Sequence, residues 1–151
     1  GGRGWGDQDL EGQANDLGIR DRVRPLGYVP TADLPALYRQ SRVYLFPSLV
    51  EGFGFPILEA FSAGVPVVTS TTTACPETAG GAALLADPTD VAAIADALAK
   101  ALDDESLRED LIARGRARAR ACTWERCARE TAAAYREAVS DHRGTQTGRV
   151  G

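Results

Sequence analysis

Residues Pro47 to Ala60 read Pro-Ser-Leu-Val-Glu-Gly-Phe-Gly-Phe-Pro-Ile-Leu-Glu-Ala. The apolar run that ends at Pro47 is typical of a buried strand, and Pro56 stands where the first turn of a helix accepts proline. A strand, a glycine-rich loop and a helix follow one another here. In open α/β sheets, ligands bind beyond the carboxyl ends of the strands. We therefore expect a ligand site on this loop.

The residue types in the loop indicate which ligand it binds. Gly52 and Gly54 let the backbone approach a ligand closely, and the unpaired N–H groups at the start of a helix over Phe55–Ala63 can receive a diphosphate. Glu51 and Glu59 flank these groups. Carboxylates accept hydrogen bonds from hydroxyls and do not bind phosphate. A diphosphate with hydroxyls on both sides, as in a nucleotide sugar, fits this pattern.

Short apolar strands alternate with helices along the chain, which predicts an α/β fold with a parallel, Rossmann-like sheet and flanking helices. Strands are expected at Val23–Gly27, Val43–Pro47, Val65–Thr69 and Ala83–Leu85. Before residue 87, helices are expected at Asp7–Leu17, at Thr31–Gln40 with Thr31 as N-cap, at Phe55–Ala63 and, as a single turn, at Cys75–Ala79. The remainder is helical: a helix capped by Asp87 with Pro88 at its first position runs to Leu102, then helices over Asp104–Cys122 and Thr123–Ser140.

The 151 residues amount to about one domain. We assign residues 1–140 to a partial nucleotide-sugar-binding domain and the polar residues 141–151 to a disordered tail. The chain holds no methionine and opens inside a glycine-rich turn. We therefore expect part of the protein to lie upstream of this sequence.

Composition excludes several classes of function. A net charge of −4 argues against non-specific binding to nucleic acid. Three cysteines and one histidine stand at no metal-ligand spacing, so we expect reduced thiols and no metal site. No apolar run approaches the roughly 20 residues of a membrane span. We expect a cytoplasmic protein, with peripheral contact at the inner face of the membrane left open.

Glu51 and Glu59 are separated by seven residues around a Gly-Phe-Gly loop. In this the sequence resembles the C-terminal domain of retaining GT-B glycosyltransferases of family 4. The resemblance covers roughly residues 1–139. Its further matching segments, in family order and spacing, are Val23–Val29, Leu37-Tyr38, Pro47-Ser48, Ala63–Val68, Cys75–Glu77 and Gly81–Pro88.

The resemblance implies roles for individual residues. Glu51, the catalytic position, would contact donor-sugar hydroxyls near the reacting carbon, and Glu59 would bind the ribose hydroxyls. The other donor-binding positions are backbone groups of Gly52, Phe53 and Gly54 at the sugar, of Phe55 at the phosphate, and of Tyr28 and Val29 beside the base.

The resemblance also implies a metal-independent hexosyltransferase that needs no cofactor beyond its nucleotide diphosphate sugar. The segment Thr69–Ala86 looks most like members that use GDP-mannose, although UDP- and ADP-sugar enzymes share this frame. The acceptor, whether a glycan, a lipid or a small molecule, is not indicated. The resemblance also implies that the chain begins just after the domain's second strand, so that the first strands of the sheet, the family's basic pair and the acceptor-binding domain would lie upstream. We therefore expect these residues alone to be inactive.

Two alternatives stay open from the sequence. One is a related nucleotide-sugar epimerase, against which the spacing of the two glutamates argues. The other is a non-catalytic nucleotide-binding or interaction module.

Two further patterns have simple structural interpretations. Asp7-Gln8-Asp9 has the spacing of a metal-binding Asp-x-Asp motif, but at a helix start it favours capping. Arg114, Arg116, Arg118 and Arg120 repeat every second residue, which spreads their charge around a helix and predicts a solvated surface.

Overall fold

The computed structural model of this chain describes residues 9–147, with side chains through residue 140. Contacts divide the chain into two units, residues 1–37 and 38–151, which are taken in turn. The division expected from the sequence, a domain over residues 1–140 and a tail from residue 141, lies elsewhere and stays a prediction.

The first unit begins with a short helix, α1 (Leu10–Asp16), followed by a single 3-10 turn at Arg20–Arg22. The carboxylate of Asp9 accepts a hydrogen bond of 2.8 Å from the N–H of Gly12 and so caps α1. The capping role expected for Asp9 is confirmed. Asp7 lies outside the described residues.

The strand predicted at Val23–Gly27 is wrong. The backbone is extended at Val23, but no strand pairs with this segment in the described part of the chain. A strand requires partners for its N–H and C=O groups, and Pro25 has no N–H to offer. A segment with two aliphatic residues and no partner strand therefore does not form a strand here.

The helix predicted from Thr31 is shorter than expected. It is α2 (Leu34–Gln40), which spans the division between the units. The N–H of Asp33 donates to the carbonyl of Pro30 at 2.9 Å, so Thr31 lies within a turn and is not the N-cap. The proline-initiated turn takes the residues that the prediction gave to the helix.

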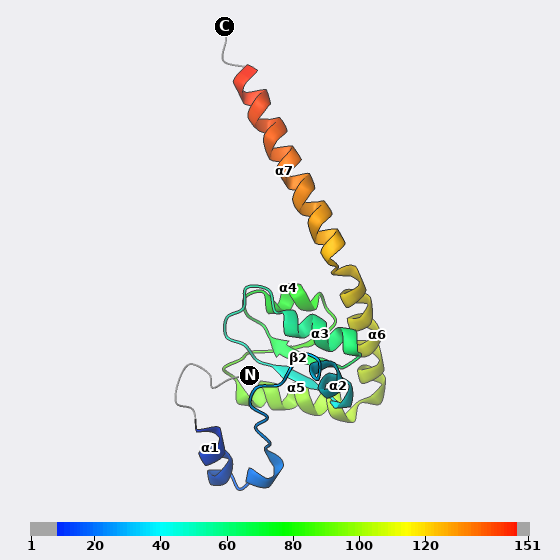
Figure 1. The fold of residues 1–151 in the computed structure, drawn as a ribbon. Coiled ribbons are helices and arrows are strands. Elements are labelled where there is room, and N and C mark those ends of the chain that lie inside the picture. Colours follow the sequence, from blue (N-terminus) through cyan, green and yellow to red (C-terminus); the bar gives the residue numbers. More distant parts are fainter. Residues whose placement is uncertain (1–8, 148–151) are drawn as a thin grey trace. The chain divides into compact units, whose positions relative to one another are not determined.

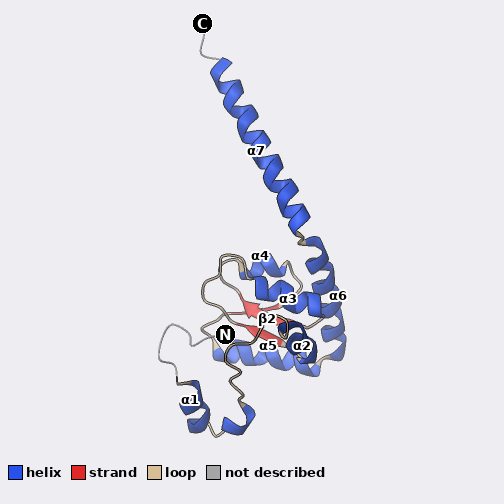
Figure 2. Ribbon diagram, in the orientation of Figure 1, coloured by secondary structure: helices blue, strands red, loops and turns tan. Residues whose placement is uncertain are grey.

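The second unit contains a parallel sheet of three strands, β1 (Tyr44–Phe46), β2 (Val67–Ser70) and β3 (Leu84–Ala86), in the order β1-β2-β3. Tyr44 lies opposite Val67, and Val68 opposite Leu84. These are the three later strands expected from the sequence. Figure 2 shows the strands with helices above and below them.

Helices cover both faces of this sheet (Figure 1). On one face, α3 (Phe55–Ala63), α4 (Cys75–Ala79) and α6 (Glu105–Ala121) pack over a core that includes Phe61 and Val67. On the other, α5 (Val91–Asp103) packs against Val68. Adjacent residues of a strand point to opposite faces, so β2 contributes to both cores. The unit is a Rossmann-like α/β fold.

The first strand, β1, is less buried than predicted. Leu45 in its middle is 38% exposed, whereas every residue of β2 is buried. Within the described residues, β1 has a neighbour on one side only, which makes it an edge strand. Its continuous apolar character indicated a strand but not its place in the sheet.

The start of α5 also differs from the prediction. Asp90, rather than Asp87, caps this helix by accepting a 3.0 Å hydrogen bond from the N–H of Ala93. Oδ1 of Asp87 instead accepts from the N–H and the hydroxyl of Thr89, and the hydroxyl bond chiefly lowers the pKa of Asp87. A local aspartate turn thus competed with the predicted helix start.

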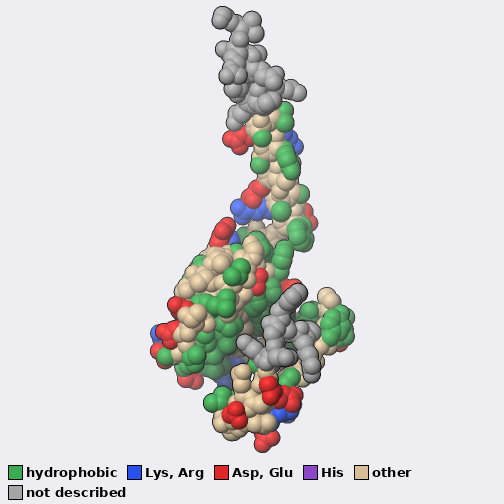
Figure 3. All heavy atoms as spheres, turned by 90° about the vertical axis from the view of Figure 1, so that its left-hand side faces the viewer, with side chains coloured by type: hydrophobic (Ala, Val, Ile, Leu, Met, Phe, Trp, Pro, Cys, Tyr) green, Lys and Arg blue, Asp and Glu red, His purple; other side chains and the backbone are tan. Residues whose placement is uncertain are grey.

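The last helix, α7 (Trp124–Thr147), continues past residue 140 into the segment predicted to be disordered. None of its side chains between residues 124 and 140 is buried, and Figure 3 shows hydrophobic side chains spaced along it among polar ones. Each residue added to a formed helix gains one backbone hydrogen bond, which favours continuing α7 into residues 141–147. Residues 148–151 lie outside the described part.

Candidate active site

The carboxyl ends of the three parallel strands share one edge of the sheet. The loop of residues 47–54, called the glycine loop below, leaves β1 at this edge and leads into α3. Residues 71–74 leave β2 at the same edge. The structure thus places the glycine loop where an open α/β sheet binds its ligands.

Gly54 is required at the junction of the glycine loop with α3. It has φ +90° and ψ 48°, and a Cβ there would lie 3.1 Å from Cδ1 of Ile57. No side chain caps α3. In its first turn Pro56 has no N–H, and the N–H of Ile57 donates to the carbonyl of Gly54 at 3.0 Å, so the N–H of Phe55 is left for another acceptor. Gly52 differs, since a Cβ added to it would meet no atom within 4 Å. Its backbone is open to an approaching ligand.

Successive backbone N–H groups of the glycine loop are unpaired. The N–H of Glu51 donates to Oγ1 of Thr73 at 3.0 Å. In contrast, no hydrogen bond within the described residues involves the N–H groups of Gly52, Phe53 or Gly54. Successive free N–H groups beside a helix N-terminus form an anion-binding surface.

The carboxylate of Glu51 is partly buried and accepts a hydrogen bond of 3.1 Å from the hydroxyl of Ser48 through Oε1. The same hydroxyl also contacts the carbonyl oxygen of Val50 at 3.2 Å. The side chain expected to contact the donor sugar is therefore oriented within its own loop.

Glu59, on the second turn of α3, accepts a 2.9 Å hydrogen bond at Oε2 from the hydroxyl of Tyr38. Within the described residues, no hydrogen bond involves Oε1 of Glu59. Burial, followed by the nearby Tyr44 and Glu59, raises the pKa of Tyr38. Tyr38 therefore stays protonated as a donor, and Glu59 keeps one oxygen for a ligand hydroxyl.

Tyr44 of β1 packs against Tyr38. Its ring meets that of Tyr38 edge to face, with centroids 5.1 Å apart. Burial chiefly raises the pKa of Tyr44, and the negative charges of Glu59 and Glu51 raise it further, against a lowering contact with Tyr38. Glu51 lies in the glycine loop, and Glu59 lies on α3, the helix that follows this loop.

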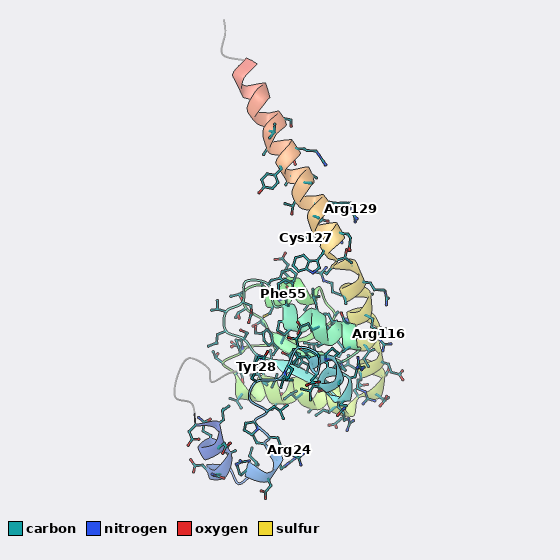
Figure 4. The ribbon with its side chains drawn as sticks, in the orientation of Figure 1. Arg24, Tyr28, Phe55, Arg116, Cys127 and Arg129 are labelled. Carbon is teal, nitrogen blue, oxygen red and sulfur yellow. The ribbon has the colours of Figure 1, made fainter. Side chains whose placement is uncertain are left out.

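Aromatic rings border the free N–H groups. Phe53 and Phe55 are 43% and 51% exposed, with ring centroids 4.8 Å apart. Trp124, at the start of α7, lies 5.8 Å from the ring of Phe55, which Figure 4 labels. The two phenylalanines therefore stand at the surface beside the site.

Tyr28 and Val29 belong to the first unit, and the positions of the two units relative to each other are not determined. Their expected place beside the nucleotide base therefore stays a prediction. The side chain of Tyr28 is exposed.

Three threonines contact the glycine loop and were not among the predicted site residues. Besides Thr73, Thr72 donates to the carbonyl of Leu49 at 3.2 Å, and Thr78 donates to the carbonyl of Phe53. The run Thr71-Thr72-Thr73 directly after a strand was the available signal. Hydroxyl residues at the same sheet edge as the loop can support its backbone.

The arginines of α6 are not simply solvated, which corrects the sequence interpretation. Arg118 donates to the carbonyls of Thr78 and Glu77 at 3.0 and 2.8 Å, at the C-terminal end of α4. Arg114 donates to the carbonyl of Gly81 at 2.6 Å. Arg114 and Arg118 share a helix face because they are four residues apart, and cations suit helix C-termini.

Arg116 takes a similar position at another helix. A Cβ added to Gly64, at the C-terminal end of α3, would lie 2.5 Å from Nη2 of Arg116. Figure 4 accordingly labels Phe55 and Arg116 at opposite ends of α3.

The described residues contain neither a candidate membrane span nor a candidate metal site. No helix among residues 9–147 has the length and apolar character needed to cross a bilayer. No group of three or more histidine, cysteine, aspartate or glutamate side chains in that range could hold a metal ion.

The fold matches that of the C-terminal domain of GT-B glycosyltransferases, and the family comparison agrees. The model of the family "Glycosyl transferases group 1" matches residues 1–118. The chain belongs to this family.

Among curated proteins, the chain is 50% identical over 135 residues to O-antigen chain mannosyltransferase B of Escherichia coli. This match covers 89% of this chain and 35% of that protein. It is 40% identical over 132 residues to D-inositol 3-phosphate glycosyltransferase of Salinispora tropica, covering 84% and 27% respectively. The chain therefore spans about a third of the length of these relatives.

Among solved structures, sucrose-phosphate synthase of Thermosynechococcus elongatus matches with a TM-score of 0.78 and 29% identity, over 93% of this chain and 38% of that one. HepE of Anabaena, solved in complex with UDP and glucose, matches with a TM-score of 0.69 and 26% identity, over 74% and 30%. Both matches extend over most of this chain and over about a third of the solved chain.

Proposed function

We propose that this chain forms the donor-binding part of a retaining glycosyltransferase that transfers a hexose from a nucleotide diphosphate sugar. One observation carries the proposal: Glu51 and Glu59 flank a loop whose successive N–H groups are free, at the uncapped start of α3. A diphosphate suits those N–H groups, and hydroxyls suit the carboxylates.

Each group then has a distinct task. The N–H groups at the start of α3 bind the diphosphate. Oε1 of Glu59 accepts a hydrogen bond from the ribose, while Tyr38 holds Oε2. Glu51, oriented by Ser48, accepts hydrogen bonds from the donor sugar.

The proposed reaction breaks the bond between the anomeric carbon and the diphosphate oxygen. The acceptor oxygen attacks from the same face, and its proton passes to the departing phosphate oxygen, so the configuration is retained. Positive charge develops on the sugar ring and negative charge on the leaving diphosphate. Glu51 and the free N–H groups are suited to stabilise these two charges. We propose no metal ion or other cofactor.

Mannose from GDP-mannose is the first donor to test. The 50% identical relative is named as a mannosyltransferase, and Thr69–Ala86 resembles the segment of GDP-mannose enzymes. The HepE complex contains UDP and glucose, so uridine nucleotides belong in the same comparison. The free cysteines Cys75, Cys122 and Cys127 suit the cytoplasmic location that we propose.

A thermal-shift panel on the whole protein tests the proposal, with GDP, UDP, ADP and their hexose conjugates as ligands. A ligand at 100 times its Kd stabilises the folded state by about 2.7 kcal/mol, a shift of several degrees. We expect a shift with guanosine nucleotides that Glu59→Ala reduces. The matched control is Glu109→Ala, an exposed glutamate of α6. A protein that melts cooperatively and responds to none of the nucleotides contradicts the proposal and favours a non-catalytic module.

A further inference from the structure

The glycine loop has no regular secondary structure, yet three side chains of one neighbouring segment hold its backbone. Thr72 donates to the carbonyl of Leu49 at 3.2 Å, Thr73 accepts from the N–H of Glu51 at 3.0 Å, and Thr78 donates to the carbonyl of Phe53. These contacts fall near the beginning, the middle and the end of the loop. Thr72, Thr73 and Thr78 are called the threonine clamp below.

Thr73 is held in an unusual conformation. Its φ of 52° is the only positive φ of a non-glycine residue within the described part of the chain. A β-branched residue is disfavoured in this region, and such strain tends to persist at functional sites. The hydroxyl of Thr73 faces Glu51 through the hydrogen bond that this conformation permits.

The clamp is itself anchored. Thr78 is buried, so its hydroxyl needs the partner that Phe53 supplies. Arg118 of α6 binds the carbonyl of Thr78 at 3.0 Å. The clamp therefore connects the loop to the packed body of the unit.

The clamp contacts the loop selectively. It occupies the N–H of Glu51 but none of the next three N–H groups, which stay free for a ligand. Glu51 thus has its backbone fixed by Thr73 and its carboxylate fixed by Ser48. Both contacts act on the residue proposed to bind the donor sugar.

We propose that Thr73, supported by Thr72 and Thr78, is a positioning residue that sets Glu51 against the sugar of the donor. This inference rests on the proposed function. It concerns the sugar end of the donor, because Glu59 and Tyr38, which serve the ribose, make no recorded contact with the clamp in the described residues. Loss of the Thr73 hydroxyl should therefore weaken binding of the intact nucleotide sugar more than binding of the nucleoside diphosphate.

The experiment measures Kd for GDP and for GDP-mannose by calorimetry on the whole protein and on four variants. Thr73→Gly removes the hydroxyl and also relieves the positive φ, so folding is retained. Thr73→Val removes the hydroxyl and keeps the branched shape. Thr73→Ser keeps the hydroxyl. Thr71→Val is the control, because Thr71 is an exposed neighbour whose recorded hydrogen bond is made by its backbone.

For Thr73→Gly and Thr73→Val we expect the Kd of GDP-mannose to rise about fivefold or more, the size of one lost hydrogen bond, with the Kd of GDP little changed. Thr73→Ser and Thr71→Val should match the unaltered protein. The inference is overturned if Thr73→Gly binds GDP-mannose normally, or if both ligands weaken equally, as general loosening would produce. An unaltered protein that binds neither ligand overturns the proposed function itself. Normal binding of both by every variant overturns only the role of the clamp.

Discussion

The hydroxyl of Tyr38 donates a hydrogen bond of 2.9 Å to Oε2 of Glu59. The donor lies on α2 and the acceptor on α3, so the bond fixes the carboxylate from a neighbouring helix. It leaves Oε1 available for a ribose hydroxyl. In the proposed function, Tyr38 is therefore a second group on which nucleotide binding would depend.

Tyr38→Phe should weaken GDP binding without unfolding the protein. It removes one hydrogen bond to a carboxylate, so we expect Kd to rise about fivefold, equivalent to about 1 kcal/mol. Calorimetry with GDP measures this change. Tyr135→Phe, an exposed tyrosine of α7, is the control. Equal affinity of Tyr38→Phe and the unaltered protein would show that Glu59 needs no such support.

Stability should fall at alkaline pH because of this tyrosine pair. Burial raises the pKa of Tyr38 and of Tyr44 in the folded state above the ordinary value of about 10. The folded protein then holds protons that the unfolded chain releases, so the stabilisation is complete below about pH 10 and is lost as pH rises further. The melting temperature should drop less steeply above about pH 10 in Tyr44→Phe than in the unaltered protein. Parallel curves for the two proteins would contradict this.

The two glycines of the glycine loop should respond differently to alanine. Gly54→Ala forces a Cβ into a left-handed backbone beside Ile57, and we expect a loss of about 1–2 kcal/mol of stability. Gly52→Ala meets no protein atom, so its melting temperature should be unchanged while donor affinity falls. Thermal melts and calorimetry with GDP-mannose separate the two effects. Normal donor binding by a folded Gly52→Ala protein would place the donor away from this backbone.

Arg118→Ala should destabilise the fold more than Arg120→Ala. Arg118 binds two carbonyls at the end of α4, whereas exposed Arg120 makes no recorded side-chain contact within the described residues. Both lie in the last turn of α6, so their effects on the helix dipole match. We expect a difference of about 1–2 kcal/mol, measured by thermal unfolding. Equal melting temperatures would mean that the Arg118 contacts do not stabilise α4.

The sequence predicted those parts of the fold that local patterns determine. The helix Phe55–Ala63 was predicted with the observed bounds, because Pro56 and Gly64 mark its ends. The strand at Val23–Gly27 was not formed, since a strand depends on partners elsewhere. Asp87 and Asp90 can both cap a helix through their carboxylates. Asp90 is the N-cap of α5, because the carboxylate of Asp87 accepts from Thr89 in a turn instead.

The candidate site was predicted in its carboxylates and glycines but not in its supporting side chains. Glu51 and Glu59 are separated by a spacing that the sequence displays directly. The bond from Thr73 to Glu51 joins residues 22 positions apart, and that from Tyr38 to Glu59 joins residues 21 apart. Such pairs arise from the order of the strands and from helix packing, which no local pattern encodes. The places of Tyr28 and Val29 stay predictions.

A crystal structure of the whole protein with bound GDP tests the central claim most directly. The account predicts the diphosphate within hydrogen-bonding distance of the N–H groups at Gly54 and Phe55. It predicts the ribose hydroxyls on Oε1 of Glu59, with Tyr38 still bound to Oε2. A well-ordered nucleotide that lies elsewhere, or that leaves Glu59 without contact, would contradict the assignment of this loop as the donor site.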